Sequence, residues 1–302
     1  MDHPIFFVHT GSIPQYLYKS LRQARFANPD SPIFLLTDGS AEACRSLGCT
    51  VLNIKKLHCE KSRQFNALYK HHSSNPEPFE KFCFLRWFYL QQAMQRLGIK
   101  QALHLDSDCM LFGSTREVFA DHARADITVS SNGSPHCCII KNGLGSYLDY
   151  ITNCFSSVEI IKEFEIRFKS QPDPETRWVL SDMTLFFEFG KSHNTGAFHD
   201  YLHANAVIDR NMSEAEGFVP WPGKKCLKRV FWEISGGALV PHFKSADQGG
   251  LRRALALHFK GAAKRRMRHF NTSSPTSSLT LGVKRFFFNR FPPINASELL
   301  KF

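Results

Sequence analysis

The feature that most constrains this chain is the alternation of short strand patterns with helical patterns over its first 105 residues. Apolar runs rich in β-forming residues stand at residues 5–8, 33–37, 50–54 and 102–105. Leu17, Leu21 and Ala24 recur at helical spacing after the first run, and an apolar stripe over residues 79–97 precedes the last. Strands that alternate with helices form parallel βαβ units covered on both faces. The sequence therefore predicts an α/β fold.

Outside these runs the pattern is less regular. The polar residues 60–78 are predicted to form a loop, and the Gly-containing stretch 190–200 is predicted to be mobile. A capping-box pattern from Ser114 to Glu117 predicts a short helix. Strands are expected at residues 126–129, 237–242 and 251–259, and residues 136–170 are expected to hold one strand and two helices.

The composition is that of an ordinary globular chain. Of the 302 residues, 43% are hydrophobic and 22% are charged, and no apolar run approaches the roughly 20 residues of a membrane span. No basic stretch precedes the short apolar run at the N-terminus, so no signal peptide is expected. Nine cysteines without a C-x-x-C pair are typical of reduced thiols. These features predict a cytoplasmic protein.

The formal net charge of +11 is concentrated near the C-terminus. Residues 252–302 hold 11 of the 38 Lys and Arg residues and one of the 27 acids. A charge confined to one end predicts a local anionic partner, which could be membrane lipid, a diphosphate or nucleic acid. Within residues 284–291, blocks of cations alternate with Phe, which favours peripheral contact with an anionic membrane.

Two acids follow the fourth predicted strand as Asp106-Ser107-Asp108. In an open parallel sheet, ligands bind at the carboxyl ends of the strands. If the strand continued through these residues, alternation would direct both carboxylates to one side and Ser107 to the other. Hard oxygen ligands in pairs suit Mg²⁺ or Mn²⁺ shared with substrate phosphates. The apolar residues on either side of the pair imply that these acids need a partner.

A second motif, His258-x-x-Gly261-x-x-Lys264, ends a late apolar run. Its spacing can wrap a turn around a phosphate. Histidine is a ligand that manganese accepts, and lysine supplies a compact positive charge for diphosphate oxygens.

Together, Asp106-x-Asp108 and His258-x-x-Gly261-x-x-Lys264 resemble the metal and diphosphate signature of the glycogenin-like and bacterial lipopolysaccharide galactosyl- and glucosyltransferases. These enzymes have the GT-A fold, which is Rossmann-like with a mostly parallel central sheet and helices on both faces. The resemblance implies a retaining transferase that moves a hexose from a uridine-diphosphate sugar to a glycan or a lipid-linked glycan.

The resemblance also implies roles for single residues. Mn²⁺ (or Mg²⁺) would be bound by Asp106, Asp108 and His258. Arg86 would reach the donor phosphates, and Asp182 would lie near the transferred sugar and the acceptor, so these two are the predicted catalytic residues. The remaining donor-binding residues would be Thr10, Gly11, Asp38, Ser107, Gly261 and Lys264.

The chain departs from the family pattern in two places. Lys264 is followed by Arg265-Arg266 where the family has Pro-Trp, and the asparagine-rich segment expected after the fifth strand reads Pro-His-Cys-Cys at residues 135–138. The predicted division is a nucleotide-sugar-binding half at residues 1–130, a half at residues 131–268 that binds the acceptor and completes the metal site, and a basic aromatic tail at residues 269–302.

Two other functions fit parts of the sequence. A nucleotidyltransferase could use the same acidic pair, although no Gly-rich triphosphate loop is evident. A nucleic-acid-binding protein could use the basic tail, which lacks an RNA-binding signature and zinc ligands. The transferase accounts for both motifs, so no nucleic-acid partner is expected.

Overall fold

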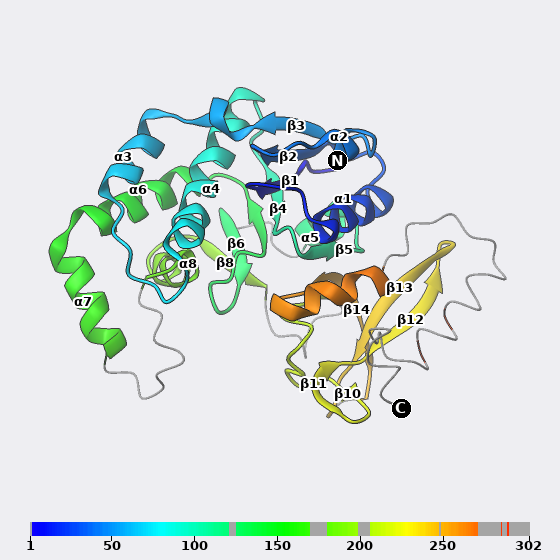
Figure 1. Ribbon diagram of the computed structural model, residues 1–302. Helices are drawn as coiled ribbons and strands as arrows, with labels where there is room; N and C mark the ends of the chain where they lie inside the picture. Colours follow the sequence, from blue (N-terminus) through cyan, green and yellow to red (C-terminus); the bar gives the residue numbers. More distant parts are fainter. Residues whose placement is uncertain are drawn as a thin grey trace.

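A seven-stranded sheet forms the centre of the protein (Figure 1). The computed structural model describes residues 2–120, 125–169, 180–198, 206–247 and 249–270, together with Arg285 and Asn289. The strand order is β3-β2-β1-β4-β7-β6-β8, and every neighbouring pair is parallel except those that involve β7. These strands are β1 (Ile5–His9), β2 (Ile33–Thr37), β3 (Thr50–Asn53), β4 (Ala102–Leu105), β6 (Ile127–Ser130), β7 (Cys137–Ile140) and β8 (Thr195–Phe198).

Helices cover both faces of this sheet, because alternate strand residues enter two separate cores. Phe6 and Val8 of β1 join one core, whereas Ile5 and Phe7 join the other. The first core packs against α3 (Glu60–Leu68), α4 (Glu77–Arg96), α6 (Leu144–Ser156), α7 (Val158–Lys169) and α8 (Asp182–Gly190). The second packs against α1 (Gln15–Ala27), α2 (Glu42–Arg45) and α5 (Thr115–Ala120). The predicted α/β class with a mostly parallel central sheet is confirmed.

A second sheet adjoins the first and has its own core. Its strands run in the order β12-β13-β14-β5, and β9 pairs with β14 in parallel. The strands are β5 (Cys109–Leu111), β9 (Ala206–Ile208), β12 (Val230–Ser235), β13 (Ala238–Lys244) and β14 (Leu251–His258), beside a hairpin of β10 (Pro220–Trp221) and β11 (Lys224–Lys228). The 3-10 helix η3 (Gly261–His269) follows β14 and packs on this core through Ala263 and Met267.

Two local predictions were wrong. Part of the segment predicted as a loop forms helix α3, where Phe65 is fully buried and the side chain of Ser62 caps the backbone of Cys59. Four residues of the segment predicted as mobile form β8, which pairs with β6 at the edge of the sheet. In both cases burial against a neighbouring element outweighs the local polar composition.

Some predictions concern residues that lie outside the described part of the chain. Of the tail at 269–302, the structure describes only the first two residues, Arg285 and Asn289. Among the described residues, no helix has the combination of length and apolar character needed to cross a membrane.

Candidate metal and donor site

The acidic pair lies on a turn that connects the two sheets. Asp106 follows β4, Asp108 precedes β5, and the N–H of Cys109 donates to the carbonyl of Asp106 at 3.0 Å. The expectation that strand alternation aligns the two carboxylates was therefore wrong. The turn reverses the chain instead, and it brings both carboxylates to the edge where the two sheets meet.

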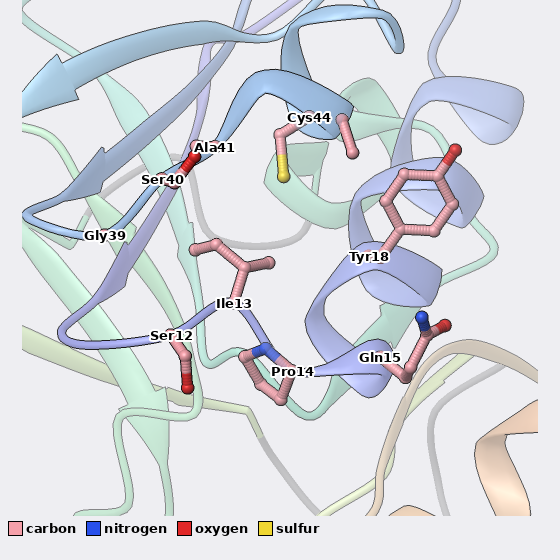
Figure 2. Close-up of a pocket in the computed structure, with 10 residues that line it drawn as sticks. Ser12, Ile13, Pro14, Gln15, Tyr18, Gly39, Ser40, Ala41 and Cys44 are labelled. Carbon is pink, nitrogen blue, oxygen red and sulfur yellow. The ribbon is translucent and has the colours of Figure 1, made fainter.

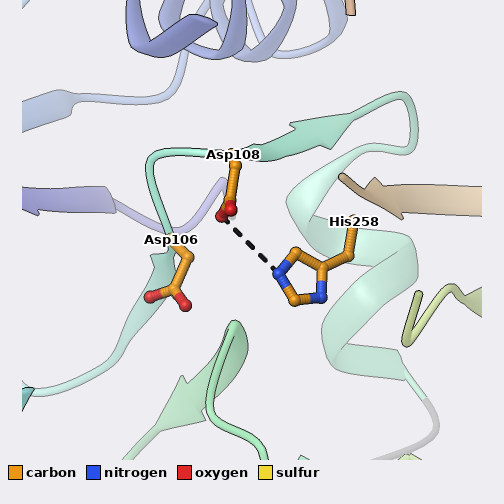
Figure 3. A group of neighbouring side chains, drawn as sticks. All are labelled: Asp106, Asp108 and His258. Carbon is orange, nitrogen blue, oxygen red and sulfur yellow. Dashed lines mark ion pairs between the residues drawn. The ribbon is translucent and has the colours of Figure 1, made fainter. Parts of the chain in front are cut away.

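His258 reaches this turn because β14 pairs with β5 in antiparallel register. His258 lies opposite Cys109, and the N–H of Phe259 donates to the carbonyl of Asp108 at 3.0 Å. One ligand atom each from Asp106, Asp108 and His258 fall within 4.8 Å of one another. Figure 3 shows that the three side chains point toward one another, with the two carboxylates on one side and the imidazole on the other. The three predicted metal ligands are thus brought together.

Cations neutralise the acidic pair within the protein. Lys264, on η3, places Nζ 3.1 Å from Oδ2 of Asp108, while Nε2 of His258 lies 3.5 Å from Oδ1. Burial by itself would raise the pKa of Asp108, but His258 and Lys264 outweigh burial and lower it. Burial would lower the pKa of both cations, and Asp108 outweighs it and raises them. Gly261 begins η3 with φ of +58°, a conformation that favours glycine.

Arg86 bridges the metal site to a second acid. From α4, its Nη1 lies 2.5 Å from Oδ1 of Asp106, and its Nη2 lies 2.7 Å from Oδ2 of Asp182 at the start of α8. Trp87 also donates to Oδ2 of Asp182, at 3.3 Å. Arg86 is 9% exposed and Asp182 is 4% exposed, so these charges depend on each other for compensation. Arg86 and Asp182 therefore lie beside the predicted metal ligands.

The predicted nucleoside residues meet at the ends of β1 and β2. Asp38 accepts from the N–H of Gly11 at 2.7 Å and from the hydroxyl of Thr10 at 3.4 Å. A Cβ atom on Gly39 would lie 1.9 Å from the carbonyl oxygen of Gly11, so the close approach of the two loops requires glycine at position 39. Ser107 does not join this group, and its carbonyl accepts from Ser20 at 3.0 Å.

A pocket opens beside these two loops (Figure 2). Its volume is about 550 Å³, and it lies between the segment that begins α1 and the segment that leads into α2. It is lined by Ser12, Ile13, Pro14, Gln15, Tyr18, Gly39, Ser40, Ala41, Ala43 and Cys44. His9 ends β1, and its Nε2 lies 3.1 Å from the carbonyl of Ser12, which lines the pocket.

Sequence reasoning missed several buried residues around the metal ligands. His104 is fully buried, packs edge-on against Trp87 with centroids 4.9 Å apart, and places Nε2 3.4 Å from Asp106. His136 stacks on His258 with centroids 4.2 Å apart. Asp209 follows β9 as Asp106 follows β4, with an aliphatic strand directly before the acid. That repeated pattern is a signal by which Asp209 could have been found.

The donor atoms at this turn fit a divalent cation. Two carboxylates and one imidazole nitrogen match the oxygen and nitrogen preferences of Mn²⁺, and Asp106 is 23% exposed at its side chain, which leaves the cluster accessible. Arg86 and His104 hold the pKa of Asp106 well below its usual value against the effect of burial. Both carboxylates are therefore ionised at neutral pH, as metal ligands must be.

Comparisons with known proteins find similarity in structure alone. No protein-family model matches this chain, and no curated protein is significantly similar to it. Apo mouse xyloside xylosyltransferase 1 aligns at 14% identity over 70% of this chain and 87% of that one, with a TM-score of 0.43. The galactosyltransferase LgtC with donor and acceptor sugar analogs aligns at 12% identity over 92% of this chain and 99% of that one, with a TM-score of 0.43.

A third solved structure of this group is a glycosyltransferase involved in glycosylation of the major capsid of PBCV-1. It aligns at 12% identity over 88% of this chain and 98% of that one, with a TM-score of 0.39. The three similar structures are all glycosyltransferases.

Proposed function

We propose that this chain is a metal-dependent glycosyltransferase that moves a hexose from a nucleotide-diphosphate sugar. The observation that carries the proposal is the convergence of Asp106, Asp108, His258 and Lys264 on one turn, from segments far apart in the sequence. Three metal ligands beside a lysine form a site for a cation and a diphosphate together. The alternative of a nucleotidyltransferase shares the acids, but no Gly-rich triphosphate loop is evident in the sequence.

In this transfer the bond between the sugar C1 and the diphosphate oxygen breaks, and a bond forms between C1 and the acceptor hydroxyl oxygen. The hydroxyl gives up its proton, and negative charge grows on the departing diphosphate, which can take up that proton. A bound Mn²⁺ would supply Lewis-acid stabilisation of that charge from Asp106, Asp108 and His258. Lys264 is half-buried and positively charged. It pairs with Asp108 and lies where its ammonium group can bind a diphosphate oxygen in place of that carboxylate. Such preorganised charge is commonly the largest single contribution to catalysis.

Asp182 is proposed to orient the transferred sugar or the acceptor hydroxyl. Its Oδ2 accepts from both Arg86 and Trp87. Among the residues that the structure describes, none donates to its Oδ1, which leaves that oxygen for a sugar hydroxyl. Arg86 fixes the carboxylate and links it to Asp106 of the metal site, so the acid is held rigidly next to the reacting group.

The donor is proposed to be a uridine-diphosphate sugar whose nucleoside binds at the Asp38 loop. The pocket beside that loop has the volume and mixed lining of a small-molecule site. A glycan or a lipid-linked glycan is the proposed acceptor, and transfer is proposed to retain the anomeric configuration. These assignments rest on the resemblance of the two motifs.

The test is a screen of nucleotide sugars for Mn²⁺-dependent hydrolysis in the absence of acceptor. Slow release of the nucleoside diphosphate from one sugar would support the proposal and identify the donor. Release of pyrophosphate from a nucleoside triphosphate and a sugar phosphate would instead establish the nucleotidyltransferase. No turnover with any nucleotide sugar, while Mn²⁺ still binds, would contradict transferase activity.

We further propose a cytoplasmic location with peripheral contact between the tail and an anionic membrane. All nine cysteines are free thiols, which agrees with a reducing compartment. Arg285 and Asn289 hydrogen-bond to the backbone of Trp232 on β12, so part of the tail is anchored to the second sheet. Equal binding of the full chain and of a chain truncated after Thr280 to anionic liposomes would contradict the membrane contact.

A further inference from the structure

A fully buried ion pair lies behind the metal-facing histidine. Lys228 and Asp209 are both 0% exposed, and Nζ of Lys228 lies 2.5 Å from Oδ1 of Asp209. The ammonium group also donates to the carbonyl of Asn211 at 3.0 Å and to Glu216. The rings of Phe218 and Phe243 pack around it, with centroids 5.9 and 5.6 Å from Nζ. Three acceptors and two aromatic rings thus hold one lysine in place.

The other oxygen of Asp209 is bonded to His258. Oδ2 accepts from the backbone N–H of His258 at 3.0 Å, and the N–H of Asp209 donates to the carbonyl of Ala256 at 2.9 Å. Asp209 is therefore hydrogen-bonded to β14 on both sides of Leu257. Since Oδ1 is bonded to Lys228, both oxygens of the carboxylate have fixed partners.

The imidazole of His258 is oriented by the same segment. Its Nδ1 lies 2.6 Å from the carbonyl of Arg210, the residue after Asp209. Because a carbonyl can only accept, Nδ1 must donate, and Nε2 is the nitrogen that faces Asp108. The ring of His136 lies parallel to that of His258 at an angle of 5°, and Nε2 of His136 bonds to the carbonyl of Asp209 at 3.0 Å.

A contribution to fold stability does not by itself explain why the Asp209–Lys228 ion pair is buried here. Removing two charges from water costs several kcal/mol per ion, and buried ion pairs can often be replaced by apolar residues without loss. The outer partners of metal-binding histidines, in contrast, orient the ring and are commonly worth about 10- to 100-fold in metal affinity.

We propose that Asp209, anchored by Lys228, is a positioning residue that holds His258 with Nε2 directed at the metal, so that divalent-metal affinity depends on this ion pair. The inference rests on the proposed metal-dependent function and extends it to Asp209 and Lys228, which are not among the predicted metal ligands or donor-binding residues. If Asp209 has this role, metal affinity depends on Asp209 after β9 and on Lys228 of β11, as well as on the acidic turn.

The test compares Mn²⁺ affinity with fold stability in the same variants. Asp209→Asn keeps the shape of the side chain, but its NH₂ group cannot accept, so the variant cannot accept from His258 and Lys228 at the same time. Mn²⁺ binding is measured by electron paramagnetic resonance at a temperature where circular dichroism shows each variant to be folded, and the thermal midpoint is measured without metal. We expect Asp209→Asn to bind Mn²⁺ at least about tenfold more weakly than the unaltered protein.

A second variant and a control keep the result decisive. The double variant Asp209→Asn, Lys228→Met removes both members of the ion pair, so the Asn amide does not face a buried ammonium, while Glu216 keeps its ion pair with Arg210. It should bind Mn²⁺ as weakly as the single variant. Asn28→Ala removes three buried hydrogen bonds, one from Thr115 and two to Ala24 and Gly113, without altering a metal ligand. It should lower the thermal midpoint and leave Mn²⁺ affinity unchanged.

The outcomes separate the two proposals. Absence of Mn²⁺ binding by the unaltered protein would overturn the metal site and with it the positioning role. Normal binding by the unaltered protein and equal binding by folded Asp209→Asn, or by the folded double variant if the single one does not fold, would overturn the positioning role alone. A lower thermal midpoint with unchanged affinity would show that the ion pair serves stability only.

Discussion

Nε2 of His258 lies 3.5 Å from Oδ1 of Asp108, across the antiparallel pairing of β14 with β5. Because this pairing makes the two residues one unit, Asp108→Asn and His258→Ala should each abolish Mn²⁺-stimulated turnover. Each should also lose the thermal stabilisation that donor and Mn²⁺ give the unaltered protein, about 2.7 kcal/mol at 100 times Kd. The double variant should lose little more than either single one, because an incomplete site has little left to lose. Full Mn²⁺-dependent activity in His258→Ala would contradict the C-terminal motif.

Arg86→Ala should weaken donor use and also destabilise the protein. Removal of the guanidinium leaves the buried Asp182 and the partly exposed Asp106 without their cation, and breaking a buried pair commonly costs about 3–5 kcal/mol. Urea denaturation and donor kinetics measure the two effects. Arg63→Ala is the matched control, since Arg63 forms an exposed pair with Glu60 on α3 and its loss should change neither. Unchanged stability in Arg86→Ala would contradict the bridging role.

Asp182→Asn should lower kcat with little change in the affinity for the donor. The amide preserves the shape at the start of α8, so the N-terminal cap that Ser181 provides to Thr184 is kept, but the carboxylate is lost from beside the reacting sugar. The loss is expected at about 10²–10³-fold, as for other preorganised electrostatic groups. Steady-state kinetics together with donor binding measured by calorimetry separate the two parameters. Turnover at the normal rate would leave Asp182 with a structural role as the partner of Arg86.

Mn²⁺ affinity should rise with pH as His258 loses its proton. Asp108 holds the folded pKa of His258 above 6.5, so protons compete with the metal for Nε2 up to that raised pKa. The same shift stabilises the metal-free fold below pH 6.5, and this contribution is lost as pH rises through the folded pKa of His258. Titrations from pH 6 to pH 9 test both effects. His242→Gln, which alters a histidine outside the cluster, should keep the same profile, whereas a flat affinity profile would contradict the prediction.

The sequence by itself determined the central sheet and the chemical character of the site. Strand and helix patterns over the first 105 residues depend on local periodicity, and they predicted β1, β2, β3 and β4 together with α1 and α4. The two motifs supplied the ligand types, and the family resemblance predicted that Asp106, Asp108 and His258 would meet. Polar composition wrongly predicted loops at residues 60–78 and 190–200. Tertiary burial instead stabilises α3 and β8 within these segments.

Only the tertiary structure decided how the site is assembled. Asp106 and Asp108 are aligned by a turn between two sheets and not by strand alternation, and that turn exists because β5 leaves the central sheet to pair with β14. The Asp209–Lys228 pair depends on the register of β9 against β14. Such registers are fixed by long-range packing, because a shift in register would move the buried side chains of a strand to its other face. No local pattern encodes which distant strand will be the partner.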